Sequence, residues 1–388
     1  MKAIKFFNTV VMSLPVLLLS LFFTFRLAFA QSDVVHVDSN GSQAPDGSAV
    51  APYQLIEAGV CKVNENGIVV IQGGNYHEQI TLNKPATLTA AGGTAVIGQL
   101  TGKAHTTLKI LTYNTHLFGD EALGVLPTFA DEQRAPQIAD RIRKEDADVV
   151  AFQEVWDEEL ADVIISQADY PYYFYSNEHD EVDDILNSGL LLLSKYPIDN
   201  PSLNFYNEEA SCSPPLWCGL IPEPILQFAC IAKNCYDNND AFASKGFIGA
   251  TIEKEGFRIA IFITHTDASD AGARRGQIKE LGLAISQYHI ENPNTEVIAL
   301  GDFNVSDGGQ DYYRALLPNL GLRDAFLNTA CFSHLKGRLD YIFYSHGNVF
   351  DVLPTYGDLA SYSPDPPIDG VSDLSDHPRL VIVFSLYR

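Results

Sequence analysis

The sequence predicts an α/β domain with mixed β-sheets and helices outside, preceded by a small β-rich module. From residue 107 onward, short apolar runs alternate with amphipathic helical patterns, which is typical of strands covered on both faces. Residues 32–104 instead carry few helix signals and many closely spaced turns. Because 46% of the 388 residues are hydrophobic, the chain can build a sizeable core and is not disordered.

The first 30 residues have the composition of a secretory signal peptide. Lys2 and Lys5 precede a long apolar stretch, and the segment ends in an A-x-A-like sequence at Ala30. We therefore expect a signal peptide over residues 1–30 and a secreted or periplasmic protein. The alternative is an uncleaved membrane anchor, because the apolar run is long and Arg26 interrupts its end. No second apolar run approaches the roughly 20 residues that span a bilayer, so the mature protein is expected to be soluble or peripheral.

The cysteines point to the same compartment, because the chain has six of them and disulfides persist in oxidising surroundings. Local disulfides are expected among four that lie close together, although their pairing stays open: Cys212, Cys218, Cys230 and Cys235. Their spacing does not fit a zinc site.

The chain is strongly acidic, with a formal net charge of −24. Removing the first 30 residues, which hold three positive charges and no negative ones, brings this charge to −27. Such a surface repels polyphosphate, whereas proteins that bind nucleic acids without sequence preference gather Lys and Arg on one face. The charge therefore argues against DNA or RNA as the main substrate.

The β-rich module, residues 31–104, contains short strands between Gly and Asn-Lys-Pro turns, which indicates a β-solenoid or a small sandwich. Its GGNYHE sequence, which ends at Glu78, resembles one turn of a right-handed parallel β-helix of the pectin-lyase-like type. The segment has room for fewer coils than such folds need to be stable alone. We therefore expect an accessory module that docks on the rest of the chain.

Within residues 105–388, strands and helices alternate. Apolar runs predict strands over residues 108–113, 149–152, 258–264, 297–300 and 380–384. Helices are expected over residues 131–144 and 271–290, from apolar positions at helical spacing: Ile138, Ile142, Ile278, Leu281, Ile285 and Tyr288.

Acids, amides and histidines are expected where these strands run out. In chain order they are Asn114, Glu154, His265, Asp302, Asn304, Asp340, Asp376 and His377. Hard oxygen ligands together with imidazoles are what a Mg²⁺-dependent, phosphodiester-cleaving site requires. We therefore expect a metal-assisted phosphodiesterase.

The six motifs that hold these residues occur in the order NxH, QE, TH, GDFN, LDY and SDH. Each is weak alone, but their order over residues 107–388 resembles the endonuclease/exonuclease/phosphatase superfamily. Its members include deoxyribonuclease I, apurinic endonucleases, inositol phosphatases and neutral sphingomyelinases. The resemblance implies a four-layer α/β sandwich, in which two mixed β-sheets are flanked by helices. It also implies one or two Mg²⁺ ions, for which Mn²⁺ or Co²⁺ could substitute.

The residue types suggest how such a site would hold its metal. Glu154 is an anionic oxygen donor suited to fix Mg²⁺ against a phosphoryl oxygen, and Asn114 could orient this carboxylate or complete the metal shell. Asp302 and Asn304 are two apart on a strand-like segment, so we expect their side chains to share a face while Phe303 points into the opposite layer.

His377 is the natural general base or acid, because the pKa of a histidine lies near neutrality and a carboxylate partner would fix its tautomer. By the family pattern this partner is Asp340, which leaves Asp376 to face the metal. His265 resembles the family's second histidine, which donates to the phosphate oxygens. His116 is a doubtful further candidate. Whether Asp302 or His377 activates the attacking water stays open.

Two features point to a lipid substrate. Asp240 and Lys245 are similar to the DxxxxKG element of neutral and bacterial sphingomyelinases, where both residues face the active site; the alternative is an exposed turn with an incidental ion pair. The loop that contains Trp217, Leu220 and Ile221 could contact a membrane surface, or could equally pack on its own domain.

The sequence therefore predicts an exported, monomeric, Mg²⁺-dependent sphingomyelin phosphodiesterase that releases phosphocholine and leaves ceramide. One alternative is a secreted deoxyribonuclease I-like endonuclease, which would need a cationic groove and base-stacking aromatic residues. Another is a binding or adhesion protein with an inactive phosphodiesterase domain, against which the site motifs are all present.

Overall fold

The computed structural model describes residues 32–43, 45–78, 80, 82, 84–98, 105–118, 130–179, 188–207, 244–306, 316–329, 337–347 and 349–388. Several predictions fall outside these residues: the signal peptide, the cysteine cluster between residues 212 and 235, Asp240, and the apolar loop with Trp217, Leu220 and Ile221.

One six-stranded sheet runs in the order β14-β15-β4-β5-β7-β6. Its β4 and β5 are parallel, and the other neighbours are antiparallel. In chain order its strands are β4 (His105–Leu117), β5 (Val149–Val155), β6 (Tyr172–Tyr175), β7 (Leu191–Ser194), β14 (Asp351–Ala360) and β15 (Arg379–Tyr387).

The second six-stranded sheet runs in the order β12-β13-β11-β10-β9-β8. It too is mixed, because β10 and β11 are parallel and their neighbours are antiparallel. In chain order its strands are β8 (Asp199–Phe205), β9 (Gly246–Lys254), β10 (Phe257–His265), β11 (Glu296–Asp302), β12 (Arg323–Asp324) and β13 (Asp340–Tyr344).

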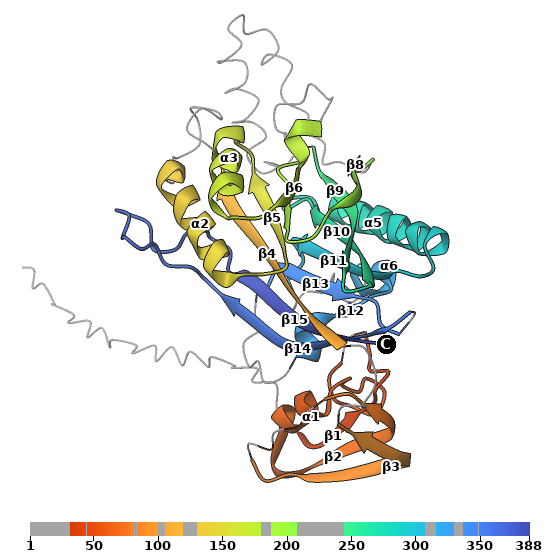
Figure 1. Ribbon diagram of the computed structural model, residues 1–388. Coiled ribbons are helices and arrows are strands. Elements are labelled where there is room, and N and C mark those ends of the chain that lie inside the picture. Colours follow the sequence, from red (N-terminus) through yellow and green to blue (C-terminus); the bar gives the residue numbers. More distant parts are fainter. Residues whose placement is uncertain are drawn as a thin grey trace, which may run out of the picture.

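Three layers of buried side chains hold the sheets and helices together. The middle one lies between the two sheets, where Ile110 and Ile382 of one sheet share a core with Ile261 of the other. Outer cores join the first sheet to α2 (Asp131–Glu145) and α3 (Glu158–Gln167), and the second sheet to α5 (Ala271–Glu291) and α6 (Leu317–Leu320). The result is the predicted four-layer α/β sandwich (Figure 1). Two short helices, η1 (Ser176–His179) and α7 (Ala325–Asn328), also lie in this region.

The strand and helix predictions for this region are confirmed, with ends that differ by a few residues. The strands predicted from apolar runs are buried on both faces, as β11 illustrates over its whole length. The predicted helix over residues 271–290 is α5, whose N-terminus is capped by the Asp270 side chain, which accepts from the amides of Gly272 and Ala273. The buried strand and the helix cap both depend on residues close together in the chain, so the sequence was sufficient to predict these elements.

The N-terminal part of the described chain, residues 32–98, forms a separate three-stranded parallel sheet. It comprises β1 (Ser32–Val37), α1 (Ile56–Lys62), β2 (Val63–Tyr76) and β3 (Thr87–Ile97), with the strand order β1-β2-β3. We call this part the N-terminal module. The resemblance of its GGNYHE sequence to a β-helix turn stays a prediction, as do the exact domain boundaries.

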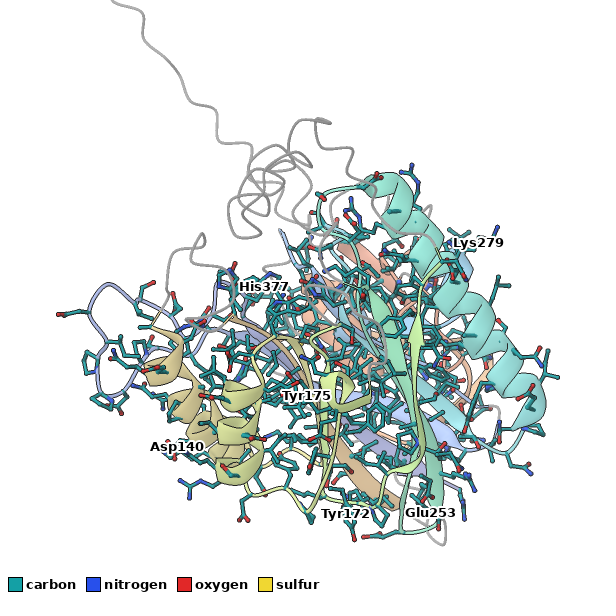
Figure 2. All side chains as sticks on the ribbon, turned by 90° about the horizontal axis from the view of Figure 1, so that it is seen from above. Asp140, Tyr172, Tyr175, Glu253, Lys279 and His377 are labelled. Carbon is teal, nitrogen blue, oxygen red and sulfur yellow. The ribbon has the colours of Figure 1, made fainter. Side chains whose placement is uncertain are left out.

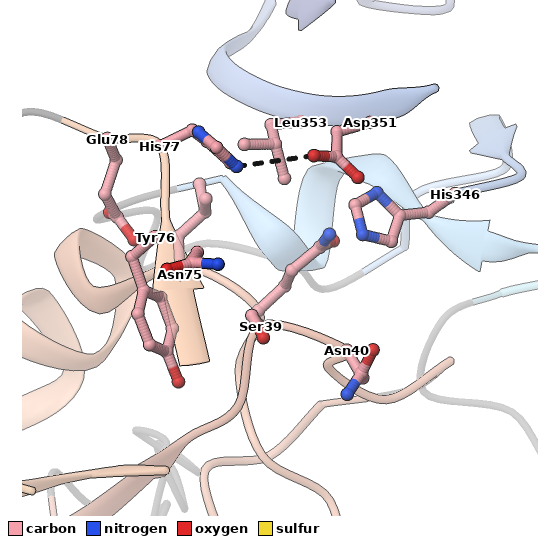
Figure 3. Close-up of a pocket in the computed structure, with 11 residues that line it drawn as sticks. Ser39, Asn40, Asn75, Tyr76, His77, Glu78, His346, Asp351 and Leu353 are labelled. Atoms are coloured by element: carbon pink, nitrogen blue, oxygen red, sulfur yellow. Dashed lines mark ion pairs between the residues drawn. The ribbon is translucent and has the colours of Figure 1, made fainter. Parts of the chain in front are cut away.

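The N-terminal module packs on the α/β sandwich beside β14 and the end of β15 (Figure 1), where Leu353 and Tyr387 join its core. His77 of the module stacks on Tyr387, whose hydroxyl donates to the His77 carbonyl oxygen at 2.9 Å. His77 Nε2 also lies 3.4 Å from Asp351 Oδ2, across a polar cavity of about 240 Å³ (Figure 3). The GGNYHE sequence therefore supplies contacts between the two parts of the chain.

Cys61, in the last turn of α1, is disulfide-bonded.

Among the described residues, no helix is both long enough and apolar enough to cross a membrane.

Candidate active site

The predicted site residues gather at one edge of the two sheets. Asn114 and Glu154 lie at the carboxyl ends of the parallel strands β4 and β5, and His265 and Asp302 end the parallel strands β10 and β11. Parallel strands end on the same side of a sheet, which brings each pair together. Seen from above, His377 lies between α2, marked by Asp140, and α5, marked by Lys279 (Figure 2).

The expectation that every site residue lies where a strand runs out is wrong for two motifs. Asp340 is the first residue of β13, and His377 precedes β15, which begins at Arg379. Both strands run antiparallel to a neighbour that ends at the site. The beginning of an antiparallel strand lies beside the end of its partner, so these residues reach the same edge.

Strand register places three site residues side by side. His265 of β10 pairs with Asp302 of β11, and Asp302 pairs with Asp340 of β13. The preceding residue, Gly301, has φ 139°, and a Cβ there would lie 1.9 Å from the Thr264 carbonyl oxygen. Only glycine fits this close approach, so the glycine of the GDFN motif keeps β10 and β11 in the register that aligns the row.

Asn114 connects the two sheets at the site. Its Nδ2 donates to Glu154 Oε1 at 2.8 Å and to Asp302 Oδ2 at 3.0 Å, while its Oδ1 accepts from the His116 amide at 3.2 Å. Asn114 therefore orients both carboxylates, one of the two roles that the sequence allowed. Its role as a metal ligand stays a prediction.

Glu154 is held in an unusual backbone conformation within β5, with φ 57°. Non-glycine residues pay a conformational penalty in this left-handed region, and such strain is concentrated at functional sites. Its Oε1 is bound by Asn114, but its buried Oε2 has no hydrogen-bond partner among the described residues. Burial raises the pKa of Glu154 to about 7.

His377 and Asp340 form the predicted pair, with His377 Nδ1 at 2.8 Å from Asp340 Oδ2. The other ring nitrogen, Nε2, lies 3.6 Å from Asp302 Oδ2. Burial lowers the pKa of His377, but the hydrogen bond and charge of Asp340, with smaller contributions from Asp302 and Asp376, raise it to about 10. Burial, followed by the charge of Asp302, raises the pKa of Asp340 to about 6.

His265 lies on the opposite side of Asp302 from the His377 pair in the strand register. Its Nε2 is 3.6 Å from Glu154 Oε1 and 3.8 Å from Asp302 Oδ2. The buried Lys245 places its Nζ 3.2 Å from His265 Nδ1 and 5.7 Å from the centre of the Trp156 ring. Lys245 therefore faces the site, as the sequence predicted, rather than a solvent-exposed turn.

Asn304 does not continue the strand as the sequence suggested. The strand β11 ends at Asp302, and Asn304 has φ 51°. Its amide donates to Asp302 Oδ1 at 2.8 Å, and its Nδ2 donates to the Thr266 carbonyl oxygen at 2.8 Å. The expectation that Asp302 and Asn304 share a strand face is therefore wrong, because the chain turns after Asp302 and the Asn304 amide bonds the Asp302 carboxylate. Phe303 is buried in the outer core, as expected.

Asp376 belongs to neither of the two groups of closely spaced ligand atoms found in the described part of the chain. Its Oδ1 accepts from Ser375 Oγ at 3.3 Å. Its role as a metal ligand therefore stays a prediction. His116, the doubtful candidate, has a pKa that burial lowers.

The donor set fits a hard divalent cation. The two groups, whose ligand atoms all lie within 4.8 Å of one another, are Glu154 with His265 and Asp302, and Asp302 with Asp340 and His377. Asp340 Oδ1, like Glu154 Oε2, is buried without a hydrogen-bond partner among the described residues. Buried carboxylates crowded in this way can ionise together only if positive charge is supplied, and their oxygens are the ligands that Mg²⁺ prefers.

Sequence reasoning missed one residue beside the site, Arg134. It lies on the buried face of α2 together with Asp131, in line with Ile138 and Ile142. A charged pair on the apolar stripe of a helix is unusual, and this was the signal that could have singled it out.

The model of the Endonuclease/Exonuclease/phosphatase family matches residues 111–377. The chain belongs to this family. The match runs from the middle of β4 to His377, so it includes the second sheet, the first sheet without β15, and every described site residue.

Three curated relatives are 24–26% identical to the chain over the residues that align. A sphingomyelinase C from Leptospira interrogans is 24% identical over 229 residues, which is 54% of this chain and 36% of that protein. A phospholipase C from Staphylococcus aureus is 25% identical over 273 residues, 63% of this chain and 73% of that protein. A sphingomyelinase C from Bacillus cereus is 26% identical over 240 residues, 55% of this chain and 62% of that protein. These names place the chain beside the bacterial sphingomyelinases of the family.

Solved structures show the same fold. The beta toxin of Staphylococcus aureus superposes with a TM-score of 0.53 at 20% identity, covering 71% of this chain and 99% of that one. A mutant of that toxin, with the same TM-score of 0.53, has bound magnesium ions. The sphingomyelinase C of Streptomyces griseocarneus gives a TM-score of 0.52 at 20% identity, over 72% of this chain and 99% of that one.

Proposed function

We propose that this protein is an exported, Mg²⁺-dependent phosphodiesterase that hydrolyses sphingomyelin to ceramide and phosphocholine. The observation that carries the proposal is the central position of Asp302. Its Oδ2 lies within 4 Å of Asn114 Nδ2, His265 Nε2 and His377 Nε2, which belong to three different strands or loops. One carboxylate flanked by two imidazoles and by a glutamate with an unpaired oxygen is suited to metal-assisted phosphoryl chemistry.

Glu154 and Asp302 are the residues that we expect to hold the metal, with Asn114 fixing both carboxylates. Mg²⁺ bound there would supply positive charge to the phosphoryl oxygens of the substrate. The strained backbone of Glu154 and its tie to Asn114 hold this carboxylate in place before substrate arrives, so little reorganisation is needed during the reaction.

The two histidines take different roles. Asp340 holds Nδ1 of His377, which fixes the ring and leaves Nε2 to exchange a proton with the attacking water or the leaving ceramide oxygen. His265, with Lys245 beside it, is placed to donate to a phosphate oxygen as negative charge builds up in the transition state. In the overall reaction a water gives up a proton and its oxygen bonds to phosphorus, the bond between phosphorus and the ceramide oxygen breaks, and that oxygen takes up a proton.

The choice of sphingomyelin rests on three observations. Sphingomyelinases from three bacterial genera are among the similar proteins. Lys245, the described half of the DxxxxKG element, lies at His265. The chain carries a net charge of −24, which disfavours long polyanionic substrates. Export is proposed from the leader sequence and agrees with a substrate that lies in membranes.

The test is a substrate panel for the purified mature protein with Mg²⁺: sphingomyelin vesicles, plasmid DNA and inositol phosphates. Phosphocholine release should fall by a factor of about 10² to 10⁴ in His377→Ala, the usual contribution of a general acid or base. His289→Ala, at the last turn of α5, serves as the matched control and should keep wild-type activity.

Nicking of DNA with intact vesicles would contradict the lipid assignment and favour the endonuclease alternative. A wild-type protein that is inactive on all three substrates would instead favour a binding role with a silent hydrolase site.

A further inference from the structure

A buried guanidinium lies behind the active site and touches two of the segments that carry it. Arg134 of α2 is only 2% exposed. Its Nη1 donates to the carbonyl oxygens of Thr115 at 2.9 Å and Leu374 at 2.7 Å, and its Nη2 donates to the carbonyl oxygen of His116. One side chain therefore joins the end of β4, which carries Asn114, to the loop that carries His377.

Asp131 fixes this guanidinium from the same helix. Its Oδ1 accepts from Arg134 Nη2 at 2.5 Å, and its Oδ2 accepts from the Phe118 amide at 2.9 Å. The two charged side chains are each 3% exposed. A fully buried ion pair rarely adds to stability compared with apolar side chains, so its presence here calls for another reason.

Ser375 makes a second link between the same two segments. Its hydroxyl donates to the Asn114 carbonyl oxygen at 2.7 Å and accepts from the His377 amide at 3.1 Å. Asn114 in turn binds Glu154 and Asp302. The loop with His377 is thus tied to the strand with Asn114 through backbone groups at two points, Arg134 and Ser375.

We propose that Arg134 is a positioning residue that sets the distance between His377 and the carboxylates of Glu154 and Asp302. Its hydrogen bonds to the carbonyl oxygens of Thr115, His116 and Leu374 act through the backbone on both sides of the site. The inference rests on the proposed hydrolytic site, because it assumes that His377 and the carboxylates act on one phosphodiester.

Only an arginine can make all of these bonds. Its planar fork presents five N–H donors in fixed directions, whereas the ammonium of a lysine is a single point of charge. Arg134→Lys keeps a positive charge for Asp131 but cannot reach three carbonyl oxygens at once. The loop with His377 should then move relative to Asn114, and displacements of about 1 Å can cost 100-fold in rate.

The experiment compares Arg134→Lys with Arg141→Lys, a matched control on the exposed side of the same helix, where Arg141 donates to the Ser363 carbonyl oxygen. The substrate is bis(p-nitrophenyl) phosphate, so that the result does not depend on lipid specificity. For Arg134→Lys we expect kcat to fall at least tenfold with KM changed less than twofold. The imidazole NMR signals of His377 should shift in this variant and stay in place in Arg141→Lys.

Ser375→Ala provides a second, independent measurement if Arg134→Lys does not fold. It removes the hydroxyl that links the Asn114 carbonyl to the His377 amide, and kcat should fall several-fold without a change in KM. Where both variants fold, the double variant should lose less than the product of the two single losses, because both act on one displacement.

Wild-type kcat in a folded Arg134→Lys, or in Ser375→Ala, would overturn the positioning role. A wild-type enzyme that hydrolyses no phosphodiester at all would instead contradict the proposed function, so the two failures are distinguishable.

Discussion

Two glutamates, the buried Glu78 and the largely buried Glu154, both have a pKa raised to about 7 but differ in their surroundings. Burial raises the pKa of Glu78, in the N-terminal module, to about 7, and burial raises that of Glu154, at the active site, to about 7 as well. The oxygens of Glu78 accept from the amides of Ile56 at 2.7 Å and Glu57 at 3.0 Å, in the first turn of α1. Glu154 has a single amide donor, Asn114, and a buried oxygen with no partner among the described residues.

The comparison separates a structural acid from a functional one. Desolvation is the largest cause of both raised pKa values, so a raised pKa does not identify the active site. The difference lies in the hydrogen bonds of the carboxylate oxygens. Both oxygens of Glu78 accept from helix amides, whereas Glu154 Oε2 has no partner among the described residues and is open to a ligand. The backbone differs as well, because Glu154 has a strained φ of 57°, as is common at functional sites.

The largest effect is expected from substituting Glu154 at the active site. Glu154→Gln should lower phosphodiesterase activity about 100-fold or more and raise the Mg²⁺ concentration needed for half-maximal activity, because the variant lacks a charged metal ligand. The same substitution in the module, Glu78→Gln, should leave both quantities within twofold of the wild type. A Mg²⁺ titration of all three proteins measures this.

An unchanged metal titration in Glu154→Gln would mean that the primary ligand has been misplaced. Equal losses in the two variants would mean that the N-terminal module takes part in the reaction.

The second effect concerns stability and pH. The folded-state pKa of Glu78, about 7, lies above its ordinary value of 4.5, so between these pH values the folded state binds a proton that the unfolded state has lost. The free energy of unfolding should therefore fall as pH rises from 4.5 to 7, by up to about 3 kcal/mol, and level off above pH 7.

Glu78→Gln should remove this part of the pH dependence, which denaturant unfolding at pH 5, 6, 7 and 8 would reveal. Parallel curves for the variant and the wild type would show that the helix amides already compensate for the burial of Glu78.

The smallest effect lies at the junction between the module and the catalytic domain. The side chain of Asp351 is 31% exposed and 3.4 Å from His77, so water screens the pair. Asp351→Asn should lower the free energy of unfolding by less than about 1 kcal/mol and leave phosphodiesterase activity unchanged. This strand edge is far from the site, since the stretch of β4 from His105 to Asn114 spans roughly 30 Å. Loss of activity in Asp351→Asn would reveal coupling between the module and the site.

The elements that the sequence predicted best are those whose burial pattern is local. Apolar runs such as residues 297–300 became strands buried on both faces, and the stripe through Ile278 and Leu281 became the buried side of α5. Where prediction failed, a short-range rule was extended too far. Strand alternation was applied through Asn304, although β11 ends at Asp302 and the chain turns there with a positive φ.

The sequence by itself determined the fold class and the chemical types at the site, because periodicity and motif order are written along the chain. Only the tertiary structure decided which groups meet. The register of β10, β11 and β13 aligns His265, Asp302 and Asp340, and the packing of α2 brings Arg134 behind both site segments. Contacts of this kind depend on how separate strands and helices pack, which no local pattern encodes. For the same reason, only the structure could distinguish Glu154, which has an oxygen without a hydrogen-bond partner among the described residues, from Glu78, whose oxygens accept from the amides of α1.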